Sequence, residues 1–157
     1  MSDLREVSGD VWDWYARGYW VAVPTNGTVR KDGACVMGRG LALQAARRFP
    51  GFQAAVGTWL GVAGNRVGAF PAWRLFSFPV KDNWREPVLL QLIARSVQDL
   101  TYARHLLARY EPQLAALPVV LPHVGCGNGG LRWELVRLHL WPLGGRDFLV
   151  VDNTEGA

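Results

Sequence analysis

Short apolar runs alternate with amphipathic segments along this chain, and the alternation limits its fold more than any other feature. Buried strands are expected at residues 19–24, 75–80 and 148–151, where apolar runs are bounded by glycine, proline or polar residues. This pattern predicts a layered α/β fold with a mixed, mostly parallel central sheet flanked by helices. Further strands are expected at 4–7, at 66–70 and in the run 117–127, which ends in glycines; helices are expected at 11–16, at 40–49 before Pro50, and at 52–60, 87–110 and 131–141.

The length and composition fit one folded domain spanning residues 1–157, because 50% of the residues are hydrophobic and no tract is low in complexity. No apolar run approaches the length of a membrane-spanning helix, and the N-terminal segment is polar and acidic. Neither a membrane span nor a signal peptide is therefore expected, and the expected location is cytoplasmic. Cys35 and Cys126 lie far apart in unrelated contexts, which predicts reduced thiols rather than a disulfide or a CxxC metal site.

The chain is modestly basic, with a formal net charge of +4 and a pI of about 9.5. Such a chain attracts phosphate-bearing partners through a salt-dependent field, so charge permits nucleic acid as a partner without demonstrating it. Only two of the 17 lysine and arginine residues are lysines, Lys31 and Lys81. Lys81 stands between an expected strand and the long helix. An amine there could perform chemistry that a guanidinium cannot; the alternative is an ordinary solvated charge.

Glycine-rich loops precede two of the expected helices, MGRGLAL at 37–43 and GCGNGGL at 125–131. Glycine lets the backbone approach a ligand closely and adopt positive φ, and a helix start adds unpaired N–H donors with a partial positive charge of about half a unit. Either loop alone could be a simple tight turn. Together, and with Thr25-Asn26-Gly27 after a third strand, they predict a cleft at the carboxyl ends of the strands that holds a diphosphate.

Other candidate chemistry has weaker support from residue spacing. On a strand, His123 and Cys126 would point to opposite faces, so a nucleophilic thiol–imidazole pair is not expected. His105 and His139 fall in expected helices and are interpreted as packing or surface residues. The sequence has no cluster with metal-ligand spacing and no close carboxylate pair. Most of the eight tryptophans are core candidates, whereas Trp84, in a polar stretch near the lysine, is expected to face a ligand.

These residues, in this order, resemble the macrodomain family, a three-layer α/β fold that binds ADP-ribose. The resemblance spans essentially the whole chain. Asp10 resembles the early aspartate whose carboxylate binds the adenine amino group, and Asn26, after Thr25, resembles the asparagine that reaches the distal ribose. The segment 37–41 resembles the first substrate loop, and 125–130 resembles the diphosphate loop.

Within that family, FPVKDNWREP at 78–87 and GCGNGGLRWE at 125–134 resemble the branch that contains the terminal ADP-ribose glycohydrolase and the DarG antitoxin of DarT–DarG systems. The matching lysine of that branch is catalytic, which implies the same role for Lys81. DarG-like members remove ADP-ribose from thymine bases in single-stranded DNA, whereas the terminal glycohydrolase releases it from glutamate esters on proteins. The protein-directed enzyme pairs its lysine with an aspartate in the diphosphate loop. This chain has Asn-Gly-Gly at 128–130 instead, which favours the DNA-directed reaction.

The resemblance therefore implies an ADP-ribosyl glycohydrolase with an antitoxin-like activity, and no cofactor or metal. The alternatives are a glycohydrolase of ADP-ribosylated protein and a non-catalytic ADP-ribose reader. The implied partners are ADP-ribose, ADP-ribosylated single-stranded DNA and, as a further candidate, a cognate ADP-ribosyltransferase toxin; no membrane is involved. DarG proteins carry a separate toxin-binding domain, for which this chain has no room.

The resemblance also implies the residues of the site. Lys81 would act on the distal ribose, either through its positive charge or as a nucleophile that passes through a Schiff base. The residues expected to bind substrate are Asp10, Val11, Thr25, Asn26, Gly38, Arg39, Gly40, Leu41, Trp84, His123, Gly125, Cys126, Gly127, Asn128, Gly129 and Gly130.

Overall fold

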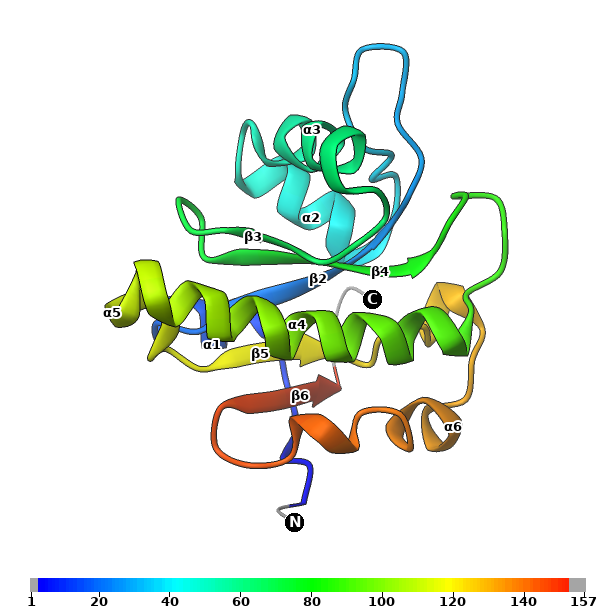
Figure 1. The fold of residues 1–157 in the computed structure, drawn as a ribbon. Helices are drawn as coiled ribbons and strands as arrows, with labels where there is room; N and C mark the ends of the chain where they lie inside the picture. The colour runs from blue at the N-terminus through cyan, green and yellow to red at the C-terminus, as the bar shows by residue number, and fades with distance from the viewer. Residues whose placement is uncertain (1–2, 153–157) are drawn as a thin grey trace.

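The computed structural model describes residues 3–152, apart from the side chain of Asn128, and has a six-stranded sheet at its centre (Figure 1). Across the sheet the order is β1-β6-β5-β2-β4-β3, and every neighbouring pair is parallel except β3 with β4. The predicted mixed, mostly parallel sheet is thus confirmed. The strands are β1 (Glu6–Ser8), β2 (Trp20–Asn26), β3 (Gly68–Phe70), β4 (Leu75–Lys81), β5 (Val119–Pro122) and β6 (Phe148–Asp152).

Helices cover both faces of the sheet, which confirms the three-layer arrangement. On one face lie α1 (Val11–Ala16), α2 (Gly40–Arg48) and α3 (Phe52–Ala63). On the other face lie α4 (Leu90–Tyr110), α5 (Pro112–Ala115), α6 (Trp133–Arg137) and the 3₁₀ helix η2 (Trp141–Leu143), while a second 3₁₀ helix, η1 (Gly127–Gly129), follows β5. None of the helices within residues 3–152 is long and apolar enough to cross a membrane.

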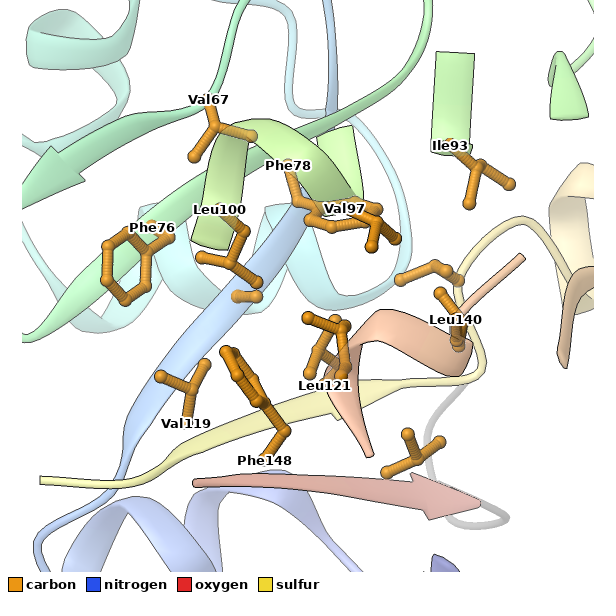
Figure 2. Packing of buried hydrophobic residues seen from close by; sticks show 14 of the residues in the cluster. Val67, Phe76, Phe78, Ile93, Val97, Leu100, Val119, Leu121, Leu140 and Phe148 are labelled. Atoms are coloured by element: carbon orange, nitrogen blue, oxygen red, sulfur yellow. The ribbon is translucent and has the colours of Figure 1, made fainter. Parts of the chain in front are cut away.

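Each central strand sends alternate side chains into two separate cores. In β2, Trp20 and Ala22 pack on the α4 side, whereas Val21 and Val23 pack on the side of α1, α2 and α3. A strand that is buried on both faces must be apolar throughout, which explains the continuous apolar runs of the sequence. Figure 2 shows the core on the α4 side, whose buried members include Phe76, Phe78, Ile93, Val97, Leu100, Val119, Leu121 and Phe148.

The long helix begins three residues later than predicted. Residues 87–89 are not helical, because the Leu89 N–H donates to the Val80 carbonyl oxygen at 3.0 Å and ties the segment back to the end of β4. Val88 is buried in the same core. The segment between Lys81 and Leu90 is therefore a loop anchored at both ends, and it projects from the carboxyl end of β4 (Figure 1).

The helix predicted over 131–141 is broken into α6 and η2. The His139 N–H donates to the Val136 carbonyl and the Leu140 N–H to the Arg137 carbonyl, so the turns after α6 tighten to three-residue spacing. Pro142 has no N–H with which to continue an α-helix. The short helices α5 and η1 were not predicted.

The strand predicted over 117–127 ends at Pro122, where the Val124 N–H donates to the Pro122 carbonyl oxygen at 2.8 Å and starts a turn. The premise that His123 and Cys126 lie on a strand is therefore wrong. Their relation to each other is set by this turn rather than by strand alternation.

Candidate functional site

A cleft of about 1250 Å³ opens at the carboxyl ends of four neighbouring strands. Its walls include the last residues of β2, β4, β5 and β6, namely Asn26, Lys81, Pro122 and Asp152. Ligands of parallel α/β sheets bind at this edge, because the loops that follow the strands lie together there. The cleft is thus where the sequence predicted it.

The first glycine-rich loop forms one wall, with Gly38, Arg39, Gly40 and Leu41 all bordering the cleft. Gly40 is the first residue of α2 and has a φ of 56°, in the region that favours glycine. Arg39 stands at the N-cap without a side-chain capping bond, so the amide groups of the first turn of α2 are not capped by that side chain. The wall therefore combines helix-start N–H donors with a guanidinium, which suits an anionic group.

The second glycine-rich loop forms the opposite wall through Gly125, Cys126, Gly127 and Gly129. Gly125 has a φ of 77°, and a Cβ atom there would come within 2.9 Å of Ile93 Cδ1 and 3.0 Å of Val88 Cγ1. Backbone conformation and packing both require glycine at this position. The loop consequently runs close above the start of α4 and exposes its backbone to the cleft.

Lys81 is the last residue of β4, and its Nζ donates to the Trp84 carbonyl oxygen at 2.9 Å. A register shift in β2 between Thr25 and Asn26 pairs Asn26 with Lys81 on the adjacent strand. An ammonium group has three N–H donors, so two remain for a ligand when one is used on Trp84. The Lys81 amine is therefore held in place at the rim of the cleft and still has N–H groups available to bind a ligand.

Asn26 is buried, and its amide also supports the loop that follows β2. Nδ2 donates to the Val36 carbonyl oxygen at 3.0 Å, and Oδ1 accepts from the Thr28 N–H at 2.9 Å. Thr25 borders the cleft next to it. The second Nδ2 hydrogen is not used by these bonds and is available to a ligand. That Asn26 reaches a ribose stays a prediction.

Trp84 borders the cleft with 43% of its surface exposed, and the Arg85 guanidinium lies 4.9 Å from its ring centroid. The Trp84 N–H donates to Thr28 Oγ1 at 3.0 Å, which joins this loop to the one after β2. An aromatic face backed by a guanidinium is suited to stacking against a planar ring.

His123 borders the cleft at the other end and stacks on Trp133, with ring centroids 3.8 Å apart and an interplanar angle of 4°. Its Nδ1 lies 4.0 Å from Asp152 Oδ1. Burial lowers the pKa of His123, and the carboxylates of Asp152 and Glu6 oppose that shift. The imidazole is therefore biased toward its neutral form.

Cys126 is half-buried, and its Sγ lies 3.7 Å from the Val124 carbonyl oxygen. Burial raises the pKa of the Cys126 thiol, and the carboxylates of Glu134 and Asp152 raise it further. A raised thiol pKa disfavours the thiolate that nucleophilic catalysis requires. Cys126 is therefore interpreted as a residue of the cleft wall and not as a nucleophile. The sequence-based argument against a thiol–imidazole pair, which placed His123 and Cys126 on a strand, was nevertheless wrong.

The cleft does not include every residue that the sequence predicted. Asp10 caps α1, where its Oδ1 accepts from the Trp12 N–H at 3.0 Å, and the side chain of Val11 is fully buried in the core. Neither borders the cleft, and neither does Gly130. Asp10 still follows Gly9, whose N–H donates to the carbonyl of the cleft residue Asp152 at 3.2 Å. The predicted side chain of Asn128 lies outside the described part of the chain.

Three polar residues of the cleft were missed by the sequence analysis: Arg85, Glu86 and Asp152. Asp152 ends β6, so the same strand-end argument that selected Asn26 could have found it. Arg85 and Glu86 share a short loop with Lys81, but a charged loop residue alone has no distinctive signal. Within residues 3–152, no group of three or more His, Cys, Asp or Glu side chains could hold a metal ion.

Comparison with known proteins places the chain in a family. No protein-family model matches it. The chain is 31% identical over 134 residues to the DNA ADP-ribosyl glycohydrolase of Thermus aquaticus, an alignment that covers 78% of this chain and 35% of that protein. It spans about a third of the length of the curated relatives that it matches.

Solved structures share the architecture, among them the following two. The macrodomain of Thermus aquaticus DarG has a TM-score of 0.69 and 26% identity, with 97% of this chain and 98% of that chain covered. Thermosipho africanus DarTG in complex with ADP-ribose has a TM-score of 0.70 and 19% identity, with 100% of this chain and 43% of that chain covered. The sequence relatives, the shared fold and the strand-end cleft together lead to one conclusion: the chain belongs to the macrodomain family, in its DarG-like branch.

Proposed function

We propose that this chain is an ADP-ribosyl glycohydrolase that removes ADP-ribose from modified bases, of the thymine type, in single-stranded DNA, with residues 1–157 acting as one macrodomain. The observation that carries the proposal is the Lys81 amine at the rim of a cleft whose walls are two glycine-rich loops. The name of the Thermus aquaticus relative, DNA ADP-ribosyl glycohydrolase, supports the reaction and the substrate.

The cleft offers a consistent place for each part of ADP-ribose. The diphosphate would lie between the start of α2 at Gly40 and the loop at Gly125, where backbone N–H donors and Arg39 favour anions. Lys81 and Asp152 end β4 and β6, which are three strand spacings apart, or about 14 Å. The adenosine would then lie toward β6 and Asp10, and the distal ribose toward β4. The solved complex of DarTG with ADP-ribose, which has the same fold, supports this kind of ligand.

Lys81 would act at the anomeric carbon of the distal ribose. In hydrolysis the bond from that carbon to the base breaks, a water oxygen bonds to the carbon, and a water proton goes to the base. A cationic amine stabilises the negative charge that develops on the departing base. An unprotonated amine could instead attack the carbon and displace the base, which takes up a proton from the amine. The ribose ring then opens to a Schiff base, and water hydrolyses that bond to release ADP-ribose and restore the amine. Both routes need the amine to face the ribose, as its position beside Asn26 allows.

The rim near Lys81 would hold the modified nucleotide and its neighbours. Trp84, with Arg85 over its ring, offers a stacking surface for a base, and Arg39 offers a phosphate partner. We place the reaction in the cytoplasm and keep a cognate ADP-ribosyltransferase toxin as a candidate partner, because one structural relative is a DarTG protein.

A second reaction has one observation in its favour. The glycine-rich loop lacks the aspartate of the protein-directed enzymes, yet Glu86 brings a carboxylate to the cleft from the loop that carries Lys81. A carboxylate near the lysine could replace the missing acid in the cleavage of protein esters. This makes ADP-ribosylated protein the alternative substrate.

The two reactions are separated by offering ADP-ribosylated single-stranded DNA and glutamate-ADP-ribosylated protein side by side and measuring free ADP-ribose. We expect faster release from the DNA. Release from protein alone would favour the alternative, and release from neither, with binding of ADP-ribose in calorimetry, would leave a non-catalytic reader. Failure to bind ADP-ribose at all would contradict the assignment of the cleft.

A further inference from the structure

The backbone at Lys81 is held by a side chain that does not border the cleft. Asn65, in the loop between α3 and β3, donates from Nδ2 to the Lys81 carbonyl oxygen at 3.0 Å and to Asp82 Oδ1 at 3.0 Å. Both partners are acceptors, so the orientation of the amide is determined: a flipped amide would place its oxygen against two other oxygens. Aspartate, which has the same shape, could not make these bonds when ionised.

The next peptide along the chain is held by the loop after β2. The Gly27 N–H donates to the Asp82 carbonyl oxygen at 2.8 Å. A Cβ atom at Gly27 would come within 2.8 Å of that oxygen and 3.0 Å of the Asn65 side chain. Gly27 and Asn65 therefore hold the two consecutive carbonyl groups of Lys81 and Asp82, and the space at Gly27 has no room for a side chain.

Asn65 is itself anchored by the long helix. Its backbone carbonyl accepts from Arg95 Nη2 of α4 at 2.6 Å. The buried Asn65 Oδ1 has no hydrogen-bond partner within residues 3–152. A buried acceptor without a hydrogen-bond partner destabilises the folded protein. The amide of Asn65 nevertheless keeps the orientation in which Nδ2 makes its two bonds.

From this geometry we infer that Asn65 is a positioning residue for the Lys81 amine. The Nζ bond to the Trp84 carbonyl closes a turn whose two ends are fixed independently, by Asn65 at the Lys81 carbonyl and by Thr28 at the Trp84 N–H. Loss of the Asn65 bonds leaves the first end held only by the pairing of β4 with β2 and by the Gly27 N–H, so we expect the amine to lose its single place at the rim. The effect on catalysis rests on the proposed function, whereas the effect on the amine does not.

The amine can be observed directly, because the chain contains only two lysines. In a protein labelled with ¹³C-lysine, the ¹H–¹³C spectrum holds two sets of Cε–Hε signals, and Lys31→Arg assigns them. An ordered Lys81 gives two distinct Hε shifts, and we expect Asn65→Ala to merge them. Asn65→Asp, which keeps the volume of the side chain, should do the same if Asn65→Ala folds poorly. Distinct shifts retained in both variants would overturn the inference.

Kinetics provide the second readout. We expect Asn65→Ala to lower kcat by about ten- to a hundredfold, the scale of misplaced catalytic groups, while the Kd for ADP-ribose stays within about twofold. Gln53→Ala is the matched control, because Gln53 Nε2 makes a comparable bond from a side-chain amide to a loop carbonyl, that of Cys35, at 2.8 Å. Equal losses of kcat in Asn65→Ala and Gln53→Ala would mean that Asn65 contributes to the stability of the fold and does not position the amine. An inactive wild-type protein would contradict the proposed function, and the lysine spectrum would still decide the inference.

Discussion

The two ends of the cleft differ in charge and in how firmly their side chains are held. At the β4 end, Lys81 and Arg85 are cationic, and Trp84 is partly exposed at the rim. At the β6 end, His123 is biased toward its neutral form, stacks on Trp133 and lies beside the Asp152 carboxylate. The difference suggests a division of labour. Changes at the β4 end should alter the rate of release, and changes at the β6 end should alter the affinity for ADP-ribose.

The largest effect is expected from Lys81→Arg, which keeps the charge but removes the amine. If amine chemistry is required, kcat should fall by about a hundredfold or more, as far as in Lys81→Ala, while ADP-ribose still binds in calorimetry. Activity well above that of Lys81→Ala would instead indicate a purely electrostatic lysine. Lys31→Arg, at the other lysine, is the control and should keep wild-type kinetics.

Trp84→Ala should sharpen the comparison by acting on one substrate only. Loss of a base-stacking surface is worth about 1–3 kcal/mol, so kcat/KM on ADP-ribosylated single-stranded DNA should fall by roughly tenfold. Release from ADP-ribosylated protein should stay within about twofold. Trp141→Ala is a matched control, since Trp141 is 62% exposed and does not border the cleft. An equal loss on both substrates would contradict a base-stacking role.

Sequence reasoning reached the sheet and the cleft for one physical reason. A strand buried on both faces must be apolar, so the runs at β2, β4 and β6 were visible, and the loops that follow parallel strands meet at one edge. That argument selected Asn26, whereas the scarcity of lysine and the family resemblance selected Lys81; the structure pairs the two residues on adjacent strands. The layered fold and the mostly parallel sheet were thus accessible from local patterns, whereas the order of the strands was not predicted.

The remaining features depend on contacts between distant residues. The start of α4 at Leu90 is set by a bond from Leu89 to Val80, which local helix signals do not contain. Asn65 reaches the Lys81 carbonyl across 16 positions of sequence, and nothing in its neighbours distinguishes it from any other loop asparagine. Boundaries and supporting residues therefore needed the three-dimensional structure.

The β6 end is tested by removing the ring on which His123 rests. Trp133→Ala eliminates the stack and the 2.8 Å bond from Trp133 Nε1 to Glu6. We expect the Kd for ADP-ribose to rise by about fivefold, in line with aromatic pairs worth roughly 0.5–1.5 kcal/mol, while kcat stays near that of the wild type. Trp133→Phe keeps a stacking ring and should recover most of the affinity. A fall in kcat without a change in Kd would break the division between the two ends.

The smallest effect is a pH dependence of stability at the same end. Burial lowers the pKa of His123 in the folded state below its ordinary value of 6.5, although Asp152 and Glu6 oppose the shift. Above pH 6.5 the His123 ring is mostly neutral in both the folded and the unfolded state. As the pH falls below that value, the unfolded chain binds the proton more readily than the folded chain does. Protonation of His123 therefore lowers the free energy of unfolding. His123→Phe keeps the ring on Trp133 but cannot titrate. Denaturant unfolding at about pH 7.5 and about pH 5 should therefore show a smaller loss in the variant than in the wild type, by less than roughly 1 kcal/mol because the imidazole is partly solvated. A larger loss in the variant would mean that the Asp152 and Glu6 carboxylates raise the pKa of His123 by more than burial lowers it, and that protonated His123 stabilises this end of the cleft.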